Sequence, residues 1–380
     1  MDARRVVLVH DWLTGMRGGE KCLEPLARRW PTARLLTLLH TRGSVSSPIE
    51  RLDIRASPLN RLPRVERYYR YLLPAMPFAA GWNVADADLV VSLSHCVAKS
   101  ARPPVGVPHV CYCFTPMRYA WHMQDAYFRK TGIVGRLKAA AVDKLLAAIR
   151  DWDRRTADRV THFVAISGTV RDRIRECYGR DSVVVYPPVD TDFYTPAAVP
   201  REDFYLVVSA LAPYKRFDLA TDACARLGKK LVVIGSGQDA KTLQAAAGPG
   251  VTFLGWQPDE VIRDHLRRAK ALLFPGEEDF GIVPLEAQAC GCPVLAFGRG
   301  GATETVRPLG AADPTGVFFA EQTADALIDA IARFERDADR FDPRAARRQA
   351  VLFRKERFET ELFALLDRAA GGGAAGRKAA

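Results

Sequence analysis

Short apolar runs alternate with longer amphipathic stretches along the whole chain. In the first half the runs are Val6–Val9, Leu89–Leu93, Val110–Phe114, Phe163–Ile166 and Val183–Val185. In the second half they are Tyr205–Ser209, Lys230–Ile234, Val251–Leu254, Ala271–Phe274 and Pro293–Phe297. Buried strands that alternate with helical segments predict a mostly parallel sheet covered on both faces. Because the pattern occurs twice, we expect an α/β protein with two doubly wound domains.

The segment from Tyr186 to Pro200 contains four prolines and interrupts this alternation. Proline denies regular structure to such a segment, so it is typical of a linker. We therefore predict a first domain over residues 1–185, a linker over 186–202 and a second domain over 203–345. A C-terminal helix over 346–369 can pack back on the first domain, and the Gly- and Ala-rich residues 370–380 form a flexible tail.

The residues between Gly276 and Glu286 form the most informative junction in the chain. They follow an apolar strand, and Pro284 favours a helix that starts close to it. Gly281 permits close approach of a ligand, and the free N–H groups of a helix start suit a phosphate or diphosphate. We expect Glu286, in the first turn, to accept hydrogen bonds from ribose hydroxyls, and Glu278 to reach a sugar beyond the diphosphate. The alternative is that both glutamates are ordinary acids favoured by the helix dipole.

Two adjacent cations, Lys215 and Arg216, follow the strand Tyr205–Ser209. Ligands of open α/β sheets bind at the carboxyl ends of strands, so Lys215 is suited to neutralise a diphosphate. As an alternative, both cations are solvated surface residues. In the first half, Gly18 and Gly19 follow the first strand and open a helix, which suits an anion or a closely approaching ligand.

Composition and charge narrow the class of protein. The chain has 380 residues, of which 48% are hydrophobic and 26% are charged, as in a soluble globular protein. No signal peptide or membrane span is expected, and the eight cysteines are expected to be reduced and packed in the core.

The net charge of +11 lies in the N-terminal half. Residues 1–200 carry 30 Lys and Arg against 19 Asp and Glu, whereas residues 201–380 carry 25 of each. The basic and aromatic stretch from Arg61 to Leu73 suits an anionic membrane surface, and the alternative is a solvated helix that covers its own core. No recognised nucleic-acid motif accompanies the charge, so a nucleic-acid partner is not expected.

A series of motifs spans nearly the whole chain. They are residues 9–20, Thr115-Pro-Met-Arg-Tyr-Ala-Trp121, Tyr178-Gly-Arg180 with Pro187-Pro-Val-Asp190, Pro213-Tyr-Lys-Arg216, and Glu278 to Glu286. With these motifs the sequence resembles the retaining glycosyltransferases of family four, whose GT-B fold has two Rossmann-like domains facing a cleft. Within that family it is similar to bacterial mannosyltransferases of polysaccharide and O-antigen assembly.

The resemblance implies a nucleotide-sugar donor in the C-terminal domain and an acceptor in the N-terminal domain. Lys215 and Glu278 would be the catalytic residues. The donor-binding residues would be Arg216, Phe280, Gly281, Ile282, Val283 and Glu286, and the loop near the leaving group and acceptor would contain Gly18, Gly19 and Arg118.

The implied reaction transfers a hexose, with mannose from GDP-mannose as the first candidate, to a lipid-linked glycan with retention of configuration. No metal or other cofactor is expected. The protein would be cytoplasmic and peripheral at the inner face of the cytoplasmic membrane. Asp86-Ala-Asp88 and Asp190-Thr-Asp192 resemble a metal-binding pair, but neither stands in a suitable position.

Two positions depart from the family pattern. Ala210 stands where many relatives have an arginine, for which Arg216 can supply the charge with different geometry. Phe114 stands where many relatives have a histidine that contacts the sugar, and His10, His95 and His122 are candidates to fill that space. These departures keep two alternatives open: a nucleotide-sugar epimerase, and a non-catalytic subunit that binds a sugar nucleotide.

Overall fold

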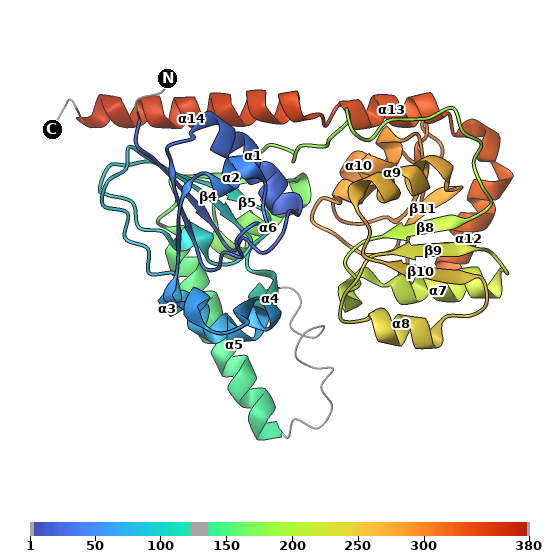
Figure 1. Cartoon of the computed structure of the whole chain (residues 1–380), viewed down its shortest axis with the longest axis horizontal. Coiled ribbons are helices and arrows are strands. Elements are labelled where there is room, and N and C mark those ends of the chain that lie inside the picture. The colour runs from blue at the N-terminus through green and yellow to red at the C-terminus, as the bar shows by residue number, and fades with distance from the viewer. Residues whose placement is uncertain (1–3, 122–135, 378–380) are drawn as a thin grey trace. The chain divides into compact units, whose positions relative to one another are not determined.

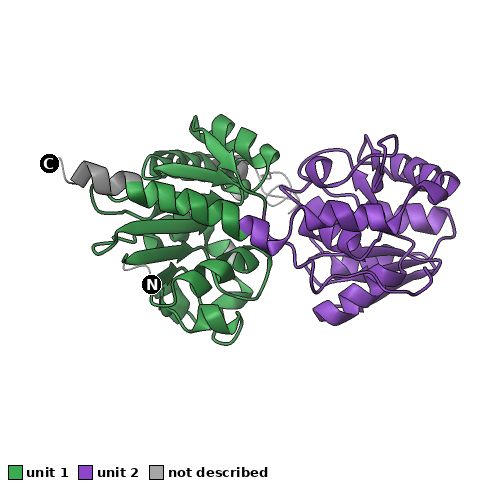
Figure 2. Ribbon diagram, turned by 90° about the horizontal axis from the view of Figure 1, so that it is seen from above, with its two compact units in different colours: residues 1–186, 359–380 green, residues 187–358 purple. Residues whose placement is uncertain are grey.

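The computed structural model describes residues 4–121 and 136–377 of the chain. Contacts within the chain divide it into two compact units, which Figure 2 shows in different colours. Unit 1 contains residues 1–186 and 359–380, and unit 2 contains residues 187–358. Each unit has its own parallel sheet, as the repeated alternation predicts.

Unit 1 contains a seven-stranded parallel sheet with the order β3-β2-β1-β4-β5-β6-β7. Its strands are β1 (Val6–His10), β2 (Arg34–Thr37), β3 (Asp53–Ala56), β4 (Leu89–Ser94), β5 (His109–Cys113), β6 (His162–Ala165) and β7 (Ser182–Val184). The strand order reverses between β1 and β4. In open α/β sheets such a switch point is where ligands bind.

The connections of unit 1 are helical (Figure 1). The α-helices are α1 (Gly18–Arg29), α2 (Ser47–Glu50), α3 (Met76–Ala79), α4 (Arg118–Trp121), α5 (Arg136–Ala157) and α6 (Gly168–Tyr178), and the 3-10 segments are η1 (Pro58–Arg61), η2 (Val65–Arg67), η3 (Tyr69–Ala75) and η4 (Ala98–Ser100). The central strands β1, β4 and β5 are buried along their whole length. This burial explains why they are continuous apolar runs in the sequence.

Unit 2 contains a six-stranded parallel sheet with the order β10-β9-β8-β11-β12-β13. Its strands are β8 (Tyr205–Val208), β9 (Leu231–Ile234), β10 (Val251–Gly255), β11 (Ala271–Phe274), β12 (Val294–Phe297) and β13 (Gly316–Phe319). The order reverses between β8 and β11, so this pair of strands forms the switch point of the second sheet.

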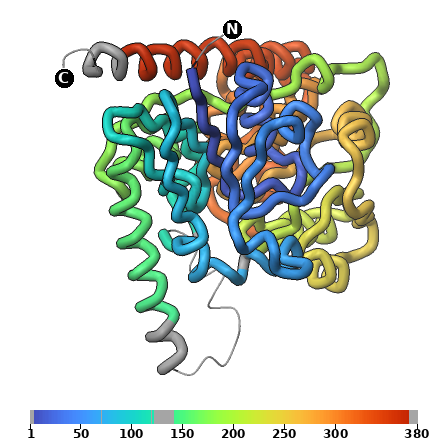
Figure 3. Tube along the Cα trace, turned by 60° about the vertical axis from the view of Figure 1, so that its left-hand side comes forward, coloured from blue at the N-terminus to red at the C-terminus, as the bar shows by residue number. Residues whose placement is uncertain are grey.

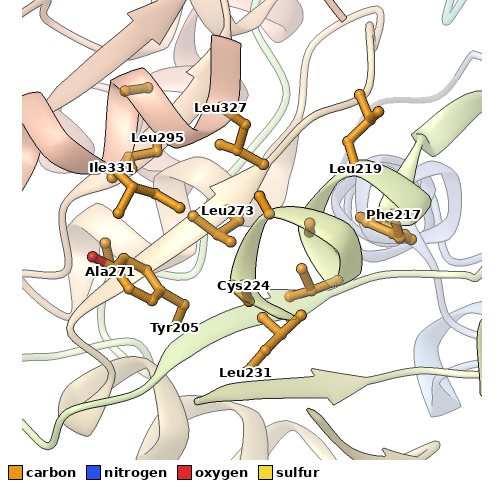
Figure 4. Packing of buried hydrophobic residues seen from close by; sticks show 14 of the residues in the cluster. Tyr205, Phe217, Leu219, Cys224, Leu231, Ala271, Leu273, Leu295, Leu327 and Ile331 are labelled. Atoms are coloured by element: carbon orange, nitrogen blue, oxygen red, sulfur yellow. The ribbon is translucent and has the colours of Figure 1, made fainter. Parts of the chain in front are cut away.

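Helices also connect the strands of unit 2. They are η6 (Pro213–Lys215), α7 (Phe217–Arg226), α8 (Ala240–Ala246), α9 (Asp259–Arg268), α10 (Ile282–Ala289), α11 (Ala302–Thr305), α12 (Ala324–Arg336), η7 (Ala338–Arg340) and α13 (Pro343–Val351). Side chains of α7 and α12 pack on the sheet. Leu219 of α7 and Ile331 of α12 lie in one buried apolar cluster with Leu273 of β11 (Figure 4). This apolar layer holds the strand ends of unit 2 in place.

All ten strands predicted from apolar runs are confirmed within one or two residues at each end. The pattern missed β2, β3 and β13. The edge strand β3 has the sequence Asp-Ile-Arg-Ala and is mostly exposed, so it lacks the apolar signal of a central strand.

The C-terminal helical region differs from the single helix expected over residues 346–369. It is divided into α13 and α14 (Lys355–Arg377), and α14 continues into the Gly- and Ala-rich residues expected to form a tail. This stretch contains no proline, so no residue forces the helix to end.

The residues of α14 from Glu359 onward belong to unit 1. Asp367 pairs with Arg4 at 2.9 Å and with Arg29 at 2.8 Å, which fixes α14 beside the N-terminal segment (Figure 3). The proline-rich residues after Pro187 belong to unit 2, where Tyr194 is buried in the core.

Candidate functional site

Lys215 lies at the switch point of the sheet in unit 2. It ends the short segment η6, and Arg216, in a left-handed conformation (φ +53°), is the N-cap residue directly before α7. The Lys215 ammonium donates to Ser209 Oγ at 2.6 Å and to Glu278 Oε1 at 2.7 Å. The two charged side chains are 11% and 19% exposed. The pair is therefore mostly desolvated but still open at one side.

Lys215 and Glu278 lie on loops that follow two neighbouring strands. Ser209 and Lys215 follow β8, and Glu278 follows β11, which pairs directly with β8. The structure therefore brings together Lys215 and Glu278, the two residues that the resemblance names as catalytic. A cation and a carboxylate at this edge can bind an anionic group and hydroxyl groups, respectively.

The backbone around Glu278 is held by its neighbours. The Gly301 amide donates to the Glu278 carbonyl at 2.8 Å. Gly281 has φ +81°, and a Cβ there would lie 3.0 Å from Phe274 Cζ, so no other residue fits without strain. Phe280 is buried, and its ring lies 5.9 Å from the ring of Phe353. The loop that presents Glu278 is thus fixed on the unit 2 core.

Helix α10 begins directly after Gly281. The N–H groups of Ile282 and Val283 belong to its first turn, where the helix itself supplies no acceptor for them. Both residues are partly exposed, and Pro284 follows them within the same turn. This helix start has the properties expected of a phosphate-binding junction.

Glu286 lies in the second turn of α10, so the prediction that it stands in the first turn is wrong. The helix starts two residues before Pro284, which moves Glu286 further into the helix. Its side chain is buried, with the residue 6% exposed. Burial, together with the negative charge of Glu286, raises the pKa of Tyr194.

Arg216 does not share the environment of Lys215. Its guanidinium binds Asp218, with Nε to Oδ1 at 3.1 Å and Nη2 to Oδ2 at 3.1 Å. Ala210 is exposed on the loop after Ser209. The two adjacent cations therefore have different partners, and Lys215 is the one that faces Glu278.

In unit 1 the loop after β1 places Asp11 in a fully buried position. Its carboxylate accepts four backbone N–H groups, from His95, Cys96, Val97 and Ala98, at 2.6 to 2.9 Å. His95 Nδ1 lies 3.0 Å from Asp11 Oδ2. Burial favours the neutral acid, but the His95 imidazole and the donated hydrogen bonds outweigh it and lower the pKa of Asp11 to about 2.

Gly18 and Gly19 open α1, as the sequence predicts. Gly19 is closely packed, since a Cβ there would lie 3.2 Å from His10 Cε1. The third residue of the helix, Glu20, is buried, and its carboxylate accepts from the Arg17 amide at 3.0 Å and lies 3.5 Å from His10 Nε2. A protein carboxylate therefore already occupies this helix start.

Phe114 follows β5 and is partly exposed. Its ring centroid lies 6.2 Å from that of His95 and 6.4 Å from that of His10. Two of the three candidate histidines therefore flank Phe114, and His122 lies outside the described residues. Arg118 is partly exposed at the start of α4, four residues after Phe114.

Sequence reasoning did not identify the partners that organise these residues. Ser209 beside Lys215, Asp11 beside His95, and Glu20 beside His10 were not singled out as pairs. A signal was available for Asp11, because it directly follows a buried strand that ends at the carboxyl edge of the sheet.

The described residues contain neither a cluster of metal ligands nor a membrane-spanning helix. These residues contain no group of three or more His, Cys, Asp or Glu that could hold a metal ion. Asp88 pairs with Arg5, and Asp190 with Lys355. Across the described ranges, no helix has both the length and the apolar character needed to cross a membrane. All eight cysteines lie within these ranges, are buried, and form no disulfide.

Two family models match the chain in sequence. Residues 16–193 match the model described as Glycosyltransferase Family 4, and residues 189–350 match Glycosyl transferases group 1. The boundary between the two matches lies close to the start of unit 2 at Pro187.

Curated relatives are similar over part of their length. The chain is 29% identical over 227 residues to a GDP-mannose-dependent alpha-(1-6)-phosphatidylinositol monomannoside mannosyltransferase of Mycobacterium tuberculosis, covering 52% of this chain and 58% of the relative. It is 36% identical over 184 residues to a D-inositol 3-phosphate glycosyltransferase of Geodermatophilus obscurus, covering 40% of each. The chain thus spans less than two thirds of the length of these relatives.

Solved structures share the fold over nearly the whole chain. Sucrose-phosphate synthase from Thermosynechococcus elongatus superposes with a TM-score of 0.70 at 16% identity, covering 97% of this chain and all of the other. Anabaena HepE in complex with UDP gives a TM-score of 0.69 at 16% identity, covering 96% of this chain and all of the other. The family matches and this fold together show that the chain belongs to the glycosyltransferases and has the GT-B architecture of two Rossmann-like units.

Proposed function

We propose that the chain is a retaining glycosyltransferase that transfers a hexose from a nucleotide sugar to a lipid-linked glycan in cell-surface polysaccharide synthesis. The observation that carries this proposal is the ion pair between Lys215 and Glu278 at the switch point of unit 2. The Lys215 ammonium also donates to Ser209 Oγ, and both charged side chains are still partly exposed. A ligand with a diphosphate next to a sugar offers a partner to each of the two charges.

In the proposed reaction the bond between the sugar anomeric carbon and the diphosphate oxygen breaks, and its electron pair leaves with the diphosphate. Lys215 donates to the diphosphate and stabilises the charge that develops there. The N–H groups of Ile282 and Val283 at the start of α10 add to this stabilisation. These groups supply positive charge for the leaving group from the protein itself, and we therefore propose that no metal is required.

Glu278 has the complementary role. When the diphosphate engages Lys215, the carboxylate of Glu278 is released to accept hydrogen bonds from sugar hydroxyls. An acceptor hydroxyl then forms the new bond to the anomeric carbon on the face that the diphosphate leaves, which retains the configuration. The O–H bond of the acceptor breaks in this step, and its proton passes to the departing diphosphate oxygen. Glu286 would hold the ribose hydroxyls, and the acceptor would bind unit 1.

Mannose from GDP-mannose is the first candidate for the donor. The support is the similarity to the mycobacterial mannosyltransferase, whose name specifies GDP-mannose. Because that alignment covers 52% of the chain, other nucleotide sugars are to be tested as donors beside GDP-mannose.

We further propose that unit 1 associates peripherally with the inner, anionic face of the cytoplasmic membrane. Arg61, Arg64 and Arg67 are exposed along η1 and η2, while Tyr71 and Phe78 in the following segments are 85% and 88% exposed. Exposed arginines meet lipid phosphates, and exposed aromatic rings enter the interface. Three residues of the same stretch, Val65, Tyr69 and Leu73, are buried in the unit 1 core and anchor the stretch to it.

The activity is tested by incubating the purified chain with radiolabelled GDP-mannose, UDP-glucose and related donors together with a bacterial lipid extract. Label transferred to lipid supports the proposal, and the Lys215→Ala variant should abolish most of it. Lys241→Ala, a change of an exposed lysine on α8, is the matched control and should have no effect. Isomerised donor without transfer would favour an epimerase, and binding without either reaction would favour a non-catalytic subunit.

The membrane proposal is tested by co-sedimentation with phosphatidylglycerol vesicles at low and high salt. Binding should be strongest at low salt, where screening is weakest, and a Tyr71→Ala, Phe78→Ala double variant should weaken it. Trp256→Ala, which changes an exposed aromatic side chain of unit 2, serves as the control. Absence of binding at low salt would contradict the proposal.

A further inference from the structure

Unit 1 contains a buried ion pair that the proposed donor site in unit 2 does not include. Lys99 in η4 is 1% exposed and Asp153 in α5 is 0% exposed, and Lys99 Nζ lies 2.6 Å from Asp153 Oδ1. The ammonium also donates to the Asp153 carbonyl at 2.8 Å and to Thr156 Oγ1 at 3.0 Å. A buried pair of this kind is weak evidence for stability, but it can specify one conformation of the elements that it joins.

The second carboxylate oxygen of Asp153 binds two further elements. Oδ2 accepts from Trp121 Nε1 at 2.9 Å and from the Tyr178 hydroxyl at 2.8 Å. Burial and the Asp153 charge raise the pKa of Tyr178, so the phenol keeps its proton and donates. Trp121 is the last residue of α4, and Tyr178 is the last residue of α6. One carboxylate therefore connects the ends of α4 and α6 to the buried ion pair.

Two other side chains of α5 contact the end of α4. Arg150 Nη1 donates to the Ala120 carbonyl at 3.2 Å, and the Arg154 guanidinium lies 5.5 Å from the centre of the Trp121 ring. Arg150, Asp153 and Arg154 are spaced so that they share one face of a helix. The last residues of α4 are therefore held by a single face of α5, with Asp153 as the acidic member of the group.

Arg118 lies at the other end of the same short helix. It is the first residue of α4 and is partly exposed, whereas Met117 and Ala120 are buried in the unit 1 core. A helix of four residues is not stable by itself, so its orientation depends on the contacts that hold it. The bond from Trp121 to Asp153 is one of these contacts, and it lies one turn from Arg118.

We infer that Asp153 is a positioning residue for sugar transfer, which fixes α4 through Trp121 and so holds Arg118 in place for contact with the acceptor. This inference rests on the proposed function, in which the acceptor binds unit 1. Asp153 itself is fully buried and does not touch the substrate. Its effect on transfer comes from geometry, since a misplacement of about 1 Å in a substrate-binding group can lower a rate roughly 100-fold.

The test uses two substitutions that each remove one hydrogen bond from the same oxygen of Asp153. Trp121→Phe removes the bond to α4, and Tyr178→Phe, the matched control, removes the bond to α6. We expect Trp121→Phe to raise the acceptor KM roughly tenfold, while acceptor-free donor hydrolysis and the affinity for GDP and UDP stay within about twofold of the wild type. In Tyr178→Phe all three quantities should stay within about twofold.

Both variants keep the ion pair between Lys99 and Asp153. Asp153→Asn is less suitable, because it leaves the buried Lys99 ammonium without its counter-charge and can unfold unit 1. Each phenylalanine variant loses one buried hydrogen bond to a charged group, so the two thermal midpoints should fall by similar amounts. Hydrogen exchange of the Ala120 and Trp121 amides, which donate to the Met117 carbonyl, should accelerate only in Trp121→Phe.

Three results would overturn the inference while transfer by the wild type upholds the proposed function. They are an unchanged acceptor KM in Trp121→Phe, an equal rise of the acceptor KM in both variants, and a parallel loss of donor hydrolysis or nucleotide affinity in Trp121→Phe. A wild-type chain that transfers no sugar would instead overturn the proposed function, and the role of Asp153 in transfer with it.

Discussion

The two sheets of the molecule carry charged residues at equivalent positions, but they use them differently. In unit 1, Asp11 is fully buried, and its carboxylate is saturated by four backbone amides and His95. In unit 2, Lys215 and Glu278 are partly exposed and hold each other through one short contact, with Ser209 as a further partner. Position at a switch point therefore does not by itself identify a ligand site. The saturated carboxylate organises a loop, and the partly exposed pair is available for exchange with a ligand.

The same contrast applies to the two adjacent cations of unit 2. Lys215 is directed toward Glu278 on a neighbouring loop, whereas Arg216 is bound to Asp218 two residues further along the chain. Arg216 has a left-handed backbone conformation at the turn between η6 and α7.

The largest expected effect is on the stability of unit 1. Asp11→Asn replaces one acceptor oxygen with a donor that faces backbone N–H groups, so we expect a loss of about 3 kcal/mol in the free energy of unfolding. Hydrogen exchange of the amides of residues 95–98 should accelerate strongly. Asp53→Asn, on the exposed edge strand β3, should stay within about 0.5 kcal/mol of the wild type. An unchanged exchange rate in Asp11→Asn would show that this carboxylate does not organise the loop.

The next effect concerns nucleotide binding in unit 2. Lys215→Ala removes the cation that faces the proposed diphosphate, and we expect nucleotide affinity to fall roughly 30-fold or more with little change in stability. Isothermal titration with GDP and UDP measures the loss, and Lys241→Ala is the control. A variant that binds nucleotide as well as the wild type would remove Lys215 from the site.

The low pKa of Asp11 predicts an acid-sensitive contribution to the stability of unit 1. Its pKa is lowered from 3.8 to about 2, so the unfolded chain binds the proton more readily than the folded chain does. The contribution is present above pH 4 and is lost as the pH falls through about 2; it amounts to about 2 kcal/mol. Urea titrations between pH 5 and pH 2 measure it, and the slope should be smaller in Asp11→Asn. Equal slopes would contradict the low pKa.

The smallest expected effect is that of Arg216→Ala. Because Asp218 already neutralises this partly exposed arginine, we expect nucleotide affinity to fall less than about threefold. Isothermal titration of Arg216→Ala and Lys215→Ala with the same nucleotides compares the contributions of the two neighbouring cations to nucleotide affinity. A loss as large as that of Lys215→Ala would show that Arg216 leaves Asp218 to bind the donor, as the resemblance implies.

The sequence predicted the fold better than the details of the site. Apolar runs identify buried central strands, but they do not identify β3, whose exposed edge position removes the apolar signal. The junction around Glu278 could be predicted because a strand, a glycine and a helix start follow one another in the chain. The partners of its charges could not, since Ser209 lies 69 residues from Glu278 and the two meet at Lys215 only through the strand order.

The turn of α10 in which Glu286 lies could not be predicted from the sequence either. Proline is common at helix starts, so the pattern favoured a helix that begins close to Pro284. The helix begins at Ile282 instead, because Gly281 adopts the left-handed conformation that ends the preceding loop. A difference of two residues moves the carboxylate from the first turn into the second.

A crystal structure of the full chain with its nucleotide sugar bound tests the proposed roles of Lys215 and Glu278 most directly. In this complex we expect Lys215 Nζ to have left Glu278 for the diphosphate, and the Glu278 carboxylate to accept hydrogen bonds from the sugar. A donor bound elsewhere in the chain, with the contact of 2.7 Å between Lys215 and Glu278 intact, would contradict these roles.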